Sequence, residues 1–188
     1  MLIDWANKTI QTKIVYYGPA MSGKTTSIRS LFNHFNQADK IESIETTTGR
    51  TLFFDYGALD MERGSWKLRV FVWSATGQDY YAETRSTVLA GTDGIIFVAD
   101  SQPHLLEDNI RSWQELQAFY GDKLGTNPSV ILCLNKYDLP VTLTRDQLLS
   151  GFGLHNGVQV FSTIAPSGWN LVEAFSAIVT SILQRCER

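Results

Sequence analysis

A glycine-rich segment near the N-terminus carries residue types that can bind phosphate. Residues 18–25 read GPAMSGKT, which matches GxxxxGKT directly after an apolar run and at the start of an amphipathic one. The glycines let successive backbone N–H groups point at phosphate oxygens, and the helix that follows adds its positive dipole end. The pattern predicts that Lys24 contacts the β- and γ-phosphates and that the Thr25 hydroxyl binds Mg²⁺. The residues expected to line this cradle are Gly18, Ala20, Met21, Ser22, Gly23, Lys24, Thr25 and Thr26.

A second polar motif, NKYD, directly follows the apolar run SVILCL. The Asp138 carboxylate offers two acceptor oxygens that fit the paired N–H donors of guanine, and adenine has no such pair. Asn135 can bond the base edge and brace the phosphate loop, while the Lys136 stem can lie along the purine face. Ala165, in the segment STIAPSG, is expected to donate its backbone N–H to the guanine oxygen. NKxD alone is a weak signal, but downstream of a phosphate loop it predicts GTP or GDP as the ligand.

The stretch VWSATGQDYY departs from the pattern of a nucleotide-hydrolysing site. An aspartate that steadies magnesium is expected before its glycine, and Ser74 stands in that place. The serine hydroxyl can still hold a magnesium-bound water, so metal binding is expected to persist. Ala20 is a second departure, because its methyl group can crowd the γ-phosphate. Two alternatives therefore stay open: an enzyme that hydrolyses GTP, or a module that binds GTP or GDP with little or no turnover.

A third alternative rests on Asp100, which ends the apolar run IIFVA. A carboxylate after a strand is typical of the metal-binding aspartate of ATPases and kinases. Asp-Ser after a strand is also a common turn or helix cap, and NKYD favours guanine over adenine. We therefore expect an ATP affinity comparable to that for GTP only if the assignment of Asp138 is wrong.

The apolar runs that precede these motifs predict the elements that position them. Their alternation with amphipathic stretches predicts an α/β fold with a mostly parallel, six-stranded sheet and helices on both faces. The polar, threonine-rich segment 38–50 predicts a functional loop, and the strands flanking 60–64 predict an antiparallel pair at the sheet edge. Strands are expected near 13–17, 51–56, 66–73, 94–99, 129–134 and 158–161. Helices are expected near 24–37, 83–90, 104–120, 144–150 and 169–185.

Length and composition favour one globular domain over residues 1–188, because 44% of residues are apolar and 19% are charged. A formal charge of −3 without Lys/Arg clusters favours neither nucleic acid nor an anionic membrane as a partner. The chain carries no signal peptide, membrane span or lipidation motif, which predicts a cytoplasmic protein without a direct membrane anchor. Cys133 and Cys186 lack metal-ligand spacing and are expected to be reduced thiols.

The segments KIVYYGPAMSGKTT, RTLFFD and GIIFVADSQ resemble the MglA family of bacterial gliding and polarity GTPases, within the Ras-like small GTPases. The resemblance covers nearly the whole chain, roughly Lys13 to Leu183. It implies a P-loop NTPase G domain that switches between GTP and GDP forms and uses Mg²⁺. Members of the family commonly lack the aspartate before the glycine, so Ser74 conforms to the family, whereas Ala20 replaces a usual glycine.

The resemblance also implies roles for residues near the γ-phosphate. The Gly77 backbone N–H is expected to sense that phosphate, and Gln78 to orient the attacking water. Arg50 is expected to neutralise charge on the transferred phosphoryl group, as Lys24 does. Thr51 is expected to be a magnesium ligand. Its rivals for that role are Thr46, Thr47 and Thr48.

Partners and cellular role follow from the resemblance alone. It implies a roadblock/LC7-type GTPase-activating protein, effectors that read the GTP form, and control of bacterial cell polarity or motility. Recruitment from the cytoplasm to the cell poles would then depend on partners. In this family the strand after the threonine-rich loop can also shift its register between nucleotide states.

Overall fold

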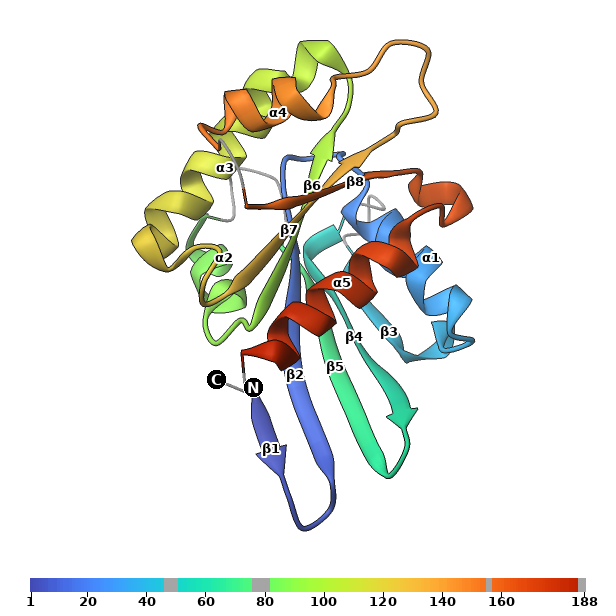
Figure 1. Cartoon of the computed structure of the whole chain (residues 1–188). Coiled ribbons are helices and arrows are strands. Elements are labelled where there is room, and N and C mark those ends of the chain that lie inside the picture. The colour runs from blue at the N-terminus through green and yellow to red at the C-terminus, as the bar shows by residue number, and fades with distance from the viewer. Residues whose placement is uncertain (46–50, 76–81, 155–156, 186–188) are drawn as a thin grey trace.

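In the computed structural model, the chain folds into a mixed sheet with helices on both faces (Figure 1). The structure describes residues 1–45, 51–75, 82–154 and 157–185. The strands are Leu2–Asp4 (β1), Thr9–Tyr17 (β2), Ile41–Glu45 (β3), Thr51–Arg63 (β4), Trp66–Ser74 (β5), Gly94–Asp100 (β6), Ser129–Asn135 (β7) and Gln159–Thr163 (β8). The helices are Lys24–His34 (α1), Ala82–Leu89 (α2), Leu106–Tyr120 (α3), Arg145–Gly151 (α4) and Leu171–Gln184 (α5). Short 3-10 segments lie at Ala38–Lys40, Pro103–Leu105, Gly121–Lys123 and Ala165–Ser167.

The sheet runs in the order β3-β4-β5-β2-β6-β7-β8, and β1 pairs with β2 outside this path. Strand β2 is parallel to β5 and β6, and β6, β7 and β8 continue the parallel part. Strands β3, β4 and β5 form an antiparallel edge, which confirms the predicted antiparallel pair around 60–64. The α/β class and the mainly parallel sheet are therefore as predicted.

The strand number is a correction, because the described residues form a sheet of eight strands where the sequence predicted six. Strand β1 has only three residues, too few for an apolar period to be visible. Strand β3, with the sequence IESIE, lies inside the predicted loop 38–50, and its pairing with β4 overrides its polar composition. Strands β2 and β4 are also longer than predicted. The additional residues are held in strands by pairing in the β1–β2 and β4–β5 hairpins. Few of their side chains are buried, so they do not show as an apolar run in the sequence.

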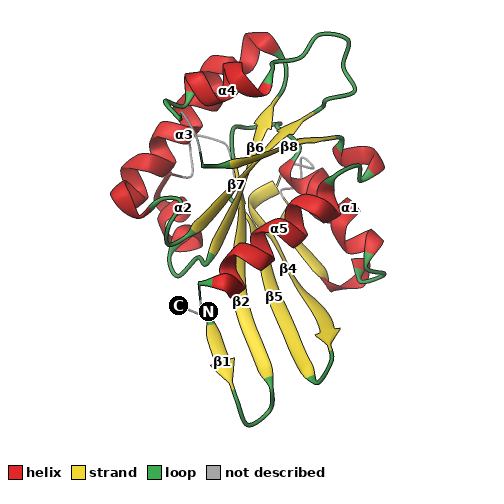
Figure 2. Ribbon diagram, in the orientation of Figure 1, coloured by secondary structure: helices red, strands yellow, loops and turns green. Residues whose placement is uncertain are grey.

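Two apolar layers, one on each face of the sheet, explain why the central strands read as unbroken apolar runs. On β2, Ile14 and Tyr16 belong to the layer under α1 and α5, whereas Val15 and Tyr17 belong to the layer under α2, α3 and α4. The ribbon view shows the helices arranged in this way on the two faces (Figure 2). All seven residues of β6 are buried. Each large apolar side chain buried in this way contributes about 1.5–3 kcal/mol.

The β1–β2 and β4–β5 hairpins extend beyond the helices. They lie at the end of the sheet opposite the carboxyl ends of β6 and β7 (Figure 2). Their tips meet where the rings of Trp5 and Trp66 lie edge to face, with centroids 5.3 Å apart. The N-terminal ammonium group binds the Asp93 carboxylate, which also accepts a hydrogen bond from the Thr12 hydroxyl at 3.0 Å. The first strand is therefore tied to the body of the sheet at both of its ends.

Two further features concern the predicted thiols and membrane contact. Cys133 is buried in β7, and burial raises the pKa of its thiol to about 12, which fits an inert core residue. Cys186 lies outside the described residues. Within the described part of the chain, no helix is both long and apolar enough to span a lipid bilayer.

Gly57 of β4 lies against the helix that follows the phosphate loop, and this contact yields a stability prediction. A Cβ atom at Gly57 would lie 2.6 Å from the Phe32 ring and 2.9 Å from the Lys40 carbonyl oxygen. We expect Gly57→Ala to lower the free energy of unfolding by about 1–3 kcal/mol through overpacking. Urea denaturation measures this change. The exposed Glu62→Ala on the same strand is the control and should change it by less than about 0.5 kcal/mol; equal midpoints for the two variants would contradict the packing account.

Candidate functional site

The carboxyl ends of five strands meet along one edge of the sheet and bring the predicted motifs together. Strand register places Tyr16 beside Ser74, Asp100 beside Asn135, and Asn135 beside Thr163. The phosphate loop follows β2, the NKYD segment begins at Asn135, the last residue of β7, and Ala165 comes shortly after β8. Ligands of open α/β sheets bind at this edge, outside the carboxyl ends of the strands.

Glycines shape the phosphate loop because neighbouring groups leave no room for a side chain. Gly18 has φ +140°, and a Cβ there would lie 2.2 Å from the Val98 carbonyl oxygen. Gly23 has φ +101°, and its Cβ would lie 2.2 Å from the Asn135 side-chain nitrogen. Met21 also has a left-handed φ of 60°, with its side chain 87% exposed. The loop therefore has the alternating backbone that makes an anion-binding concavity.

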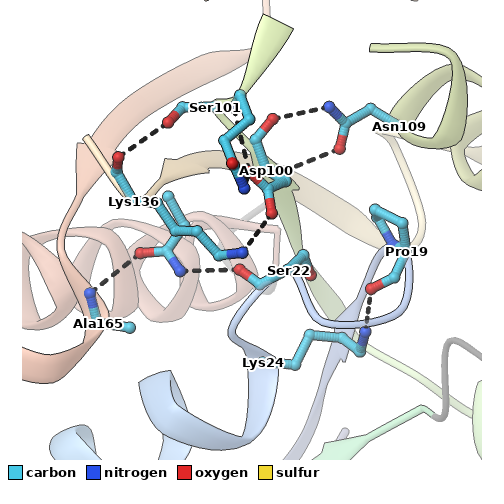
Figure 3. A network of polar contacts seen from close by, with 10 residues as sticks. Pro19, Ser22, Lys24, Asp100, Ser101, Asn109, Lys136 and Ala165 are labelled. Carbon is cyan, nitrogen blue, oxygen red and sulfur yellow. Dashed lines mark hydrogen bonds and ion pairs between the residues drawn. The ribbon is translucent and has the colours of Figure 1, made fainter. Parts of the chain in front are cut away.

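Lys24 lies inside this loop with its side chain buried. Its ammonium donates to the carbonyl oxygens of Gly18 at 2.9 Å and Pro19 at 2.6 Å (Figure 3). The positive charge of the lysine is therefore held near the N-terminus of α1. Among the described residues, no side chain caps that helix, and its first turn has no acidic residue. Both features suit an anion at the helix N-terminus. Thr25 is half-buried in the same turn, and Thr26, Ala20 and Met21 are exposed.

Asn135 connects the phosphate loop to the segment after β8. Its side-chain amide donates to the Ser22 carbonyl oxygen at 2.8 Å, and its Oδ1 accepts from the Thr163 hydroxyl at 3.2 Å. The same Oδ1 accepts the backbone N–H of Ala165 at 3.0 Å (Figure 3). The bracing of the phosphate loop expected from sequence is therefore present. The expected donation of the Ala165 N–H to guanine stays a prediction, and it requires that this N–H be shared with Asn135 or released from it.

The rest of the NKYD segment faces solvent. Asp138 and Tyr137 are exposed, and Lys136 is half-buried with a left-handed φ of 63°. The Lys136 carbonyl accepts a hydrogen bond from Ser101 at 2.9 Å, and its ammonium lies 2.5 Å from an Asp100 carboxylate oxygen. A left-handed lysine is costly, and such strain is concentrated at functional sites.

Most residues expected near the γ-phosphate fall outside the part of the chain that the structure describes. Arg50, Gly77, Gln78 and the rival threonines 46–48 lie outside the described residues. Thr51 opens β4, where its backbone pairs with Glu45, but its side chain is not described. Ser74 is described: it ends β5 next to β2 and is only 4% exposed.

Sequence reasoning missed the roles of two buried polar residues that contact the NKYD segment or its neighbours. Asp100 was interpreted as a turn or cap, or as an ATPase carboxylate, and it is a wholly buried partner of Lys136. Asn109 of α3 is also wholly buried and bonds the backbone of Asp100. The available signal for Asn109 was a polar residue on the buried face of an amphipathic helix, which does not identify its partner.

The donors of the site fit a magnesium ion that takes most of its ligands from phosphate and water. In the described ranges, no group of three or more His, Cys, Asp and Glu side chains forms a metal site. A threonine hydroxyl in the first turn of α1, beside a cradle suited to phosphate, matches the oxygen-only preference of Mg²⁺. The residues present therefore fit this ion without an all-protein cage.

The central position of Asn135 predicts a large effect on stability. Asn135→Ala would leave the buried Thr163 hydroxyl and the Ala165 N–H without their partner, as well as the Ser22 carbonyl. We expect the free energy of unfolding to fall by about 3 kcal/mol or more, measured in urea without added ligand. Asp138→Ala, an exposed change three residues away, is the matched control and should cost less than about 0.5 kcal/mol. Similar losses in both variants would argue against the bracing role of Asn135.

Comparisons with known proteins agree with this geometry. The family model described as "Ras of Complex, Roc, domain of DAPkinase" matches residues 13–138. The Mutual gliding-motility protein MglA of Myxococcus xanthus is 33% identical over 192 aligned positions, which cover 99% of this chain and 97% of that protein. Ras-related protein Rab-7b of Homo sapiens is 25% identical, covering 95% of this chain and 85% of that protein. The chain is therefore a GTP-binding switch that hydrolyses GTP, and it belongs to the MglA family of Ras-like small GTPases.

Proposed function

We propose that residues 1–188 form a single G domain whose guanine nucleotide lies along the carboxyl edge of the sheet. The observation that carries this proposal is the Asn135 amide, which ties the NKYD segment to the phosphate loop through the Ser22 carbonyl. A nucleotide bound here would have its phosphates in the cradle of residues 18–26 and its base at the segment after β7. The two ends of one ligand thus meet two segments that are already fixed relative to each other.

Each predicted residue then has a role at the base or at the phosphates. Asp138 reads the paired donors of guanine, the Lys136 stem supports the purine face, and Ala165 offers its N–H to the base oxygen. Lys24 carries positive charge to the β- and γ-phosphates from inside the loop. The buried position of Lys24 supports this role, because water screens a buried charge less than an exposed one.

Hydrolysis is proposed to use four groups around the γ-phosphate together with Lys24. Mg²⁺, held by Thr25 and Thr51, neutralises charge on the phosphate oxygens when it is bound. Gln78 orients the attacking water, Arg50 stabilises the developing charge, and the Gly77 N–H senses the phosphate. Ser74 supports metal binding by holding a magnesium-bound water, and its place at the end of β5 beside β2 is compatible with this role.

The biological role is proposed from the relatives. The name of the Myxococcus xanthus relative supports a part in gliding motility. Control of cell polarity is proposed alongside it, from the resemblance to bacterial gliding and polarity GTPases. Regulators and effectors accompany GTPases of this kind, and we propose a roadblock/LC7-type activating protein and effectors specific for the GTP form. The protein would act in the bacterial cytoplasm, hydrolyse GTP slowly without its activator, and reach the cell poles through these partners.

Single-turnover hydrolysis of preloaded GTP with Mg²⁺ tests the catalytic residues. We expect Arg50→Ala to slow phosphate release by about a thousandfold, because it removes charge stabilisation in the transition state. Gln78→Leu should slow it by about a hundredfold or more through loss of water positioning. Arg111→Ala, a surface arginine with 65% side-chain exposure, is the charge-matched control and should hydrolyse at the wild-type rate. Unchanged rates in the first two variants would contradict catalysis by the chain's own residues.

Base selectivity tests the assignment of Asp138. Asp138→Asn exchanges one acceptor for donors at the base edge, so we expect the affinity for GDP to fall by about a hundredfold or more. Xanthosine diphosphate, which offers an acceptor in place of the guanine amine, should bind this variant better than it binds the wild type. Competition against a fluorescent nucleotide measures both affinities. A variant that retains wild-type affinity for GDP would refute this role.

A further inference from the structure

The Asp100 carboxylate is a buried charged group to which the proposed catalytic and binding roles assign nothing. Asp100 is the last residue of β6, next to Asn135 in register, and its exposed fraction is 0%. A buried carboxylate is unfavourable unless a cation or several donors compensate its charge. The compensating cation here is Lys136 of the NKYD segment, whose ammonium lies 2.5 Å from Oδ2.

Hydrogen bonds fix the orientation of this carboxylate before Lys136 is considered. Asn109 accepts the Asp100 backbone N–H at 2.9 Å and donates to the Asp100 carbonyl at 2.8 Å, which fixes the backbone. Oδ1 accepts the backbone N–H of Gln102 at 3.1 Å and its side-chain amide at 3.2 Å. Among the described residues, Oδ2 has no hydrogen-bond partner of suitable geometry, so its contact with Lys136 is an ion pair.

Lys136 is held at both of its ends as a result. Its carbonyl accepts the Ser101 hydroxyl, and its ammonium pairs with Asp100, the residue before Ser101 (Figure 3). The Lys136 side chain is 30% exposed, and its charged end points at the buried Asp100 carboxylate. A lysine anchored only at its backbone would sample many rotamers instead.

We propose that Asp100 is a positioning residue for the nucleotide base, acting through Lys136. The ion pair holds the lysine stem in place before the nucleotide arrives, which lowers the entropy cost of forming the contact with the purine face. Such preorganisation lengthens the residence time of the nucleotide more than it changes the association rate. This inference rests on the proposed function, in which the Lys136 stem supports the purine.

Contact with the ring face also distinguishes Asp100 from Asp138. A face contact is indifferent to the exocyclic groups at the base edge, so loss of Asp100 should accelerate the release of GDP and inosine diphosphate by the same factor. Loss of Asp138 should change the preference between these two ligands, because inosine lacks the exocyclic amine. The comparison separates positioning of the base from reading of its edge.

A double-mutant cycle on nucleotide release tests the proposal. Dissociation of mant-GDP is measured by stopped flow for the wild type, Asp100→Asn, Lys136→Met and the double variant. We expect Asp100→Asn to accelerate release at least about tenfold, and we expect no further acceleration when it is added to Lys136→Met. Asp108→Asn, an exposed carboxylate on α3 that gives the same change in net charge, should release at the wild-type rate.

Two results would overturn the proposal: wild-type release by Asp100→Asn, or the same acceleration by Asp100→Asn when Lys136 is already Met. The second result would mean that Asp100 acts through the fold and not through Lys136. If Asp100→Asn does not fold, Asp100→Glu, which retains the charge but displaces it, replaces it in the cycle with the same expected coupling. A wild type that does not bind mant-GDP would contradict the proposed function itself, which keeps the two failures distinct.

Discussion

The side-chain amide of Asn135 is the constraint on which the geometry of the site depends. Its contacts with Ser22, Thr163 and Ala165 join segments that are separated by up to 113 residues in the sequence. The amide passes so close to Gly23 that any side chain at that glycine would displace it. The requirement for glycine at position 23 of the phosphate loop therefore comes from Asn135, at the end of β7. The phosphate loop and the NKYD segment depend on each other through this contact.

The sheet supplies the rigidity that this contact requires. Both faces of β2, β6 and β7 are covered by apolar layers, so their carboxyl ends cannot shift independently. On the other side of β2, the strand pairing changes from parallel to antiparallel after β5. The antiparallel edge consists of β5, β4 and β3, and its register is irregular between Ser43 and Glu45. The residues expected to respond to the γ-phosphate follow or precede strands of this edge: Arg50 comes just before β4, and Gln78 comes after β5. The regular parallel strands that carry Asn135 thus lie beside a less regular antiparallel edge, an arrangement that suits a GTP-binding switch.

Local motifs made most of this predictable from sequence, because each carries its own backbone requirement. Gly18 and Gly23, between an apolar run and an amphipathic one, indicated the phosphate loop. Asp138 indicated guanine because its motif lies downstream of that loop, although the motif alone is a weak signal. Strands β1 and β3 could not be predicted, because their stability comes from pairing with β2 and β4 and not from their own composition. The Asp100–Lys136 pair was equally hidden: a carboxylate after a strand suits a turn as well as an ion pair, and only the fold brings the two residues together. Ser74 stands where an aspartate is expected before the glycine, and the fold places it at the end of β5 beside β2.

The central claim is that the edge of the sheet around Asn135 binds guanine nucleotides selectively. Equilibrium competition of unlabelled GTP, GDP and ATP against mant-GDP on the wild-type protein, with Mg²⁺, tests it most directly. The account predicts that GTP and GDP displace the probe at similar concentrations, and that ATP fails to do so even at about a thousandfold excess, because Asp138 finds no paired donors on adenine. Displacement by ATP at the concentrations effective for GTP would contradict it.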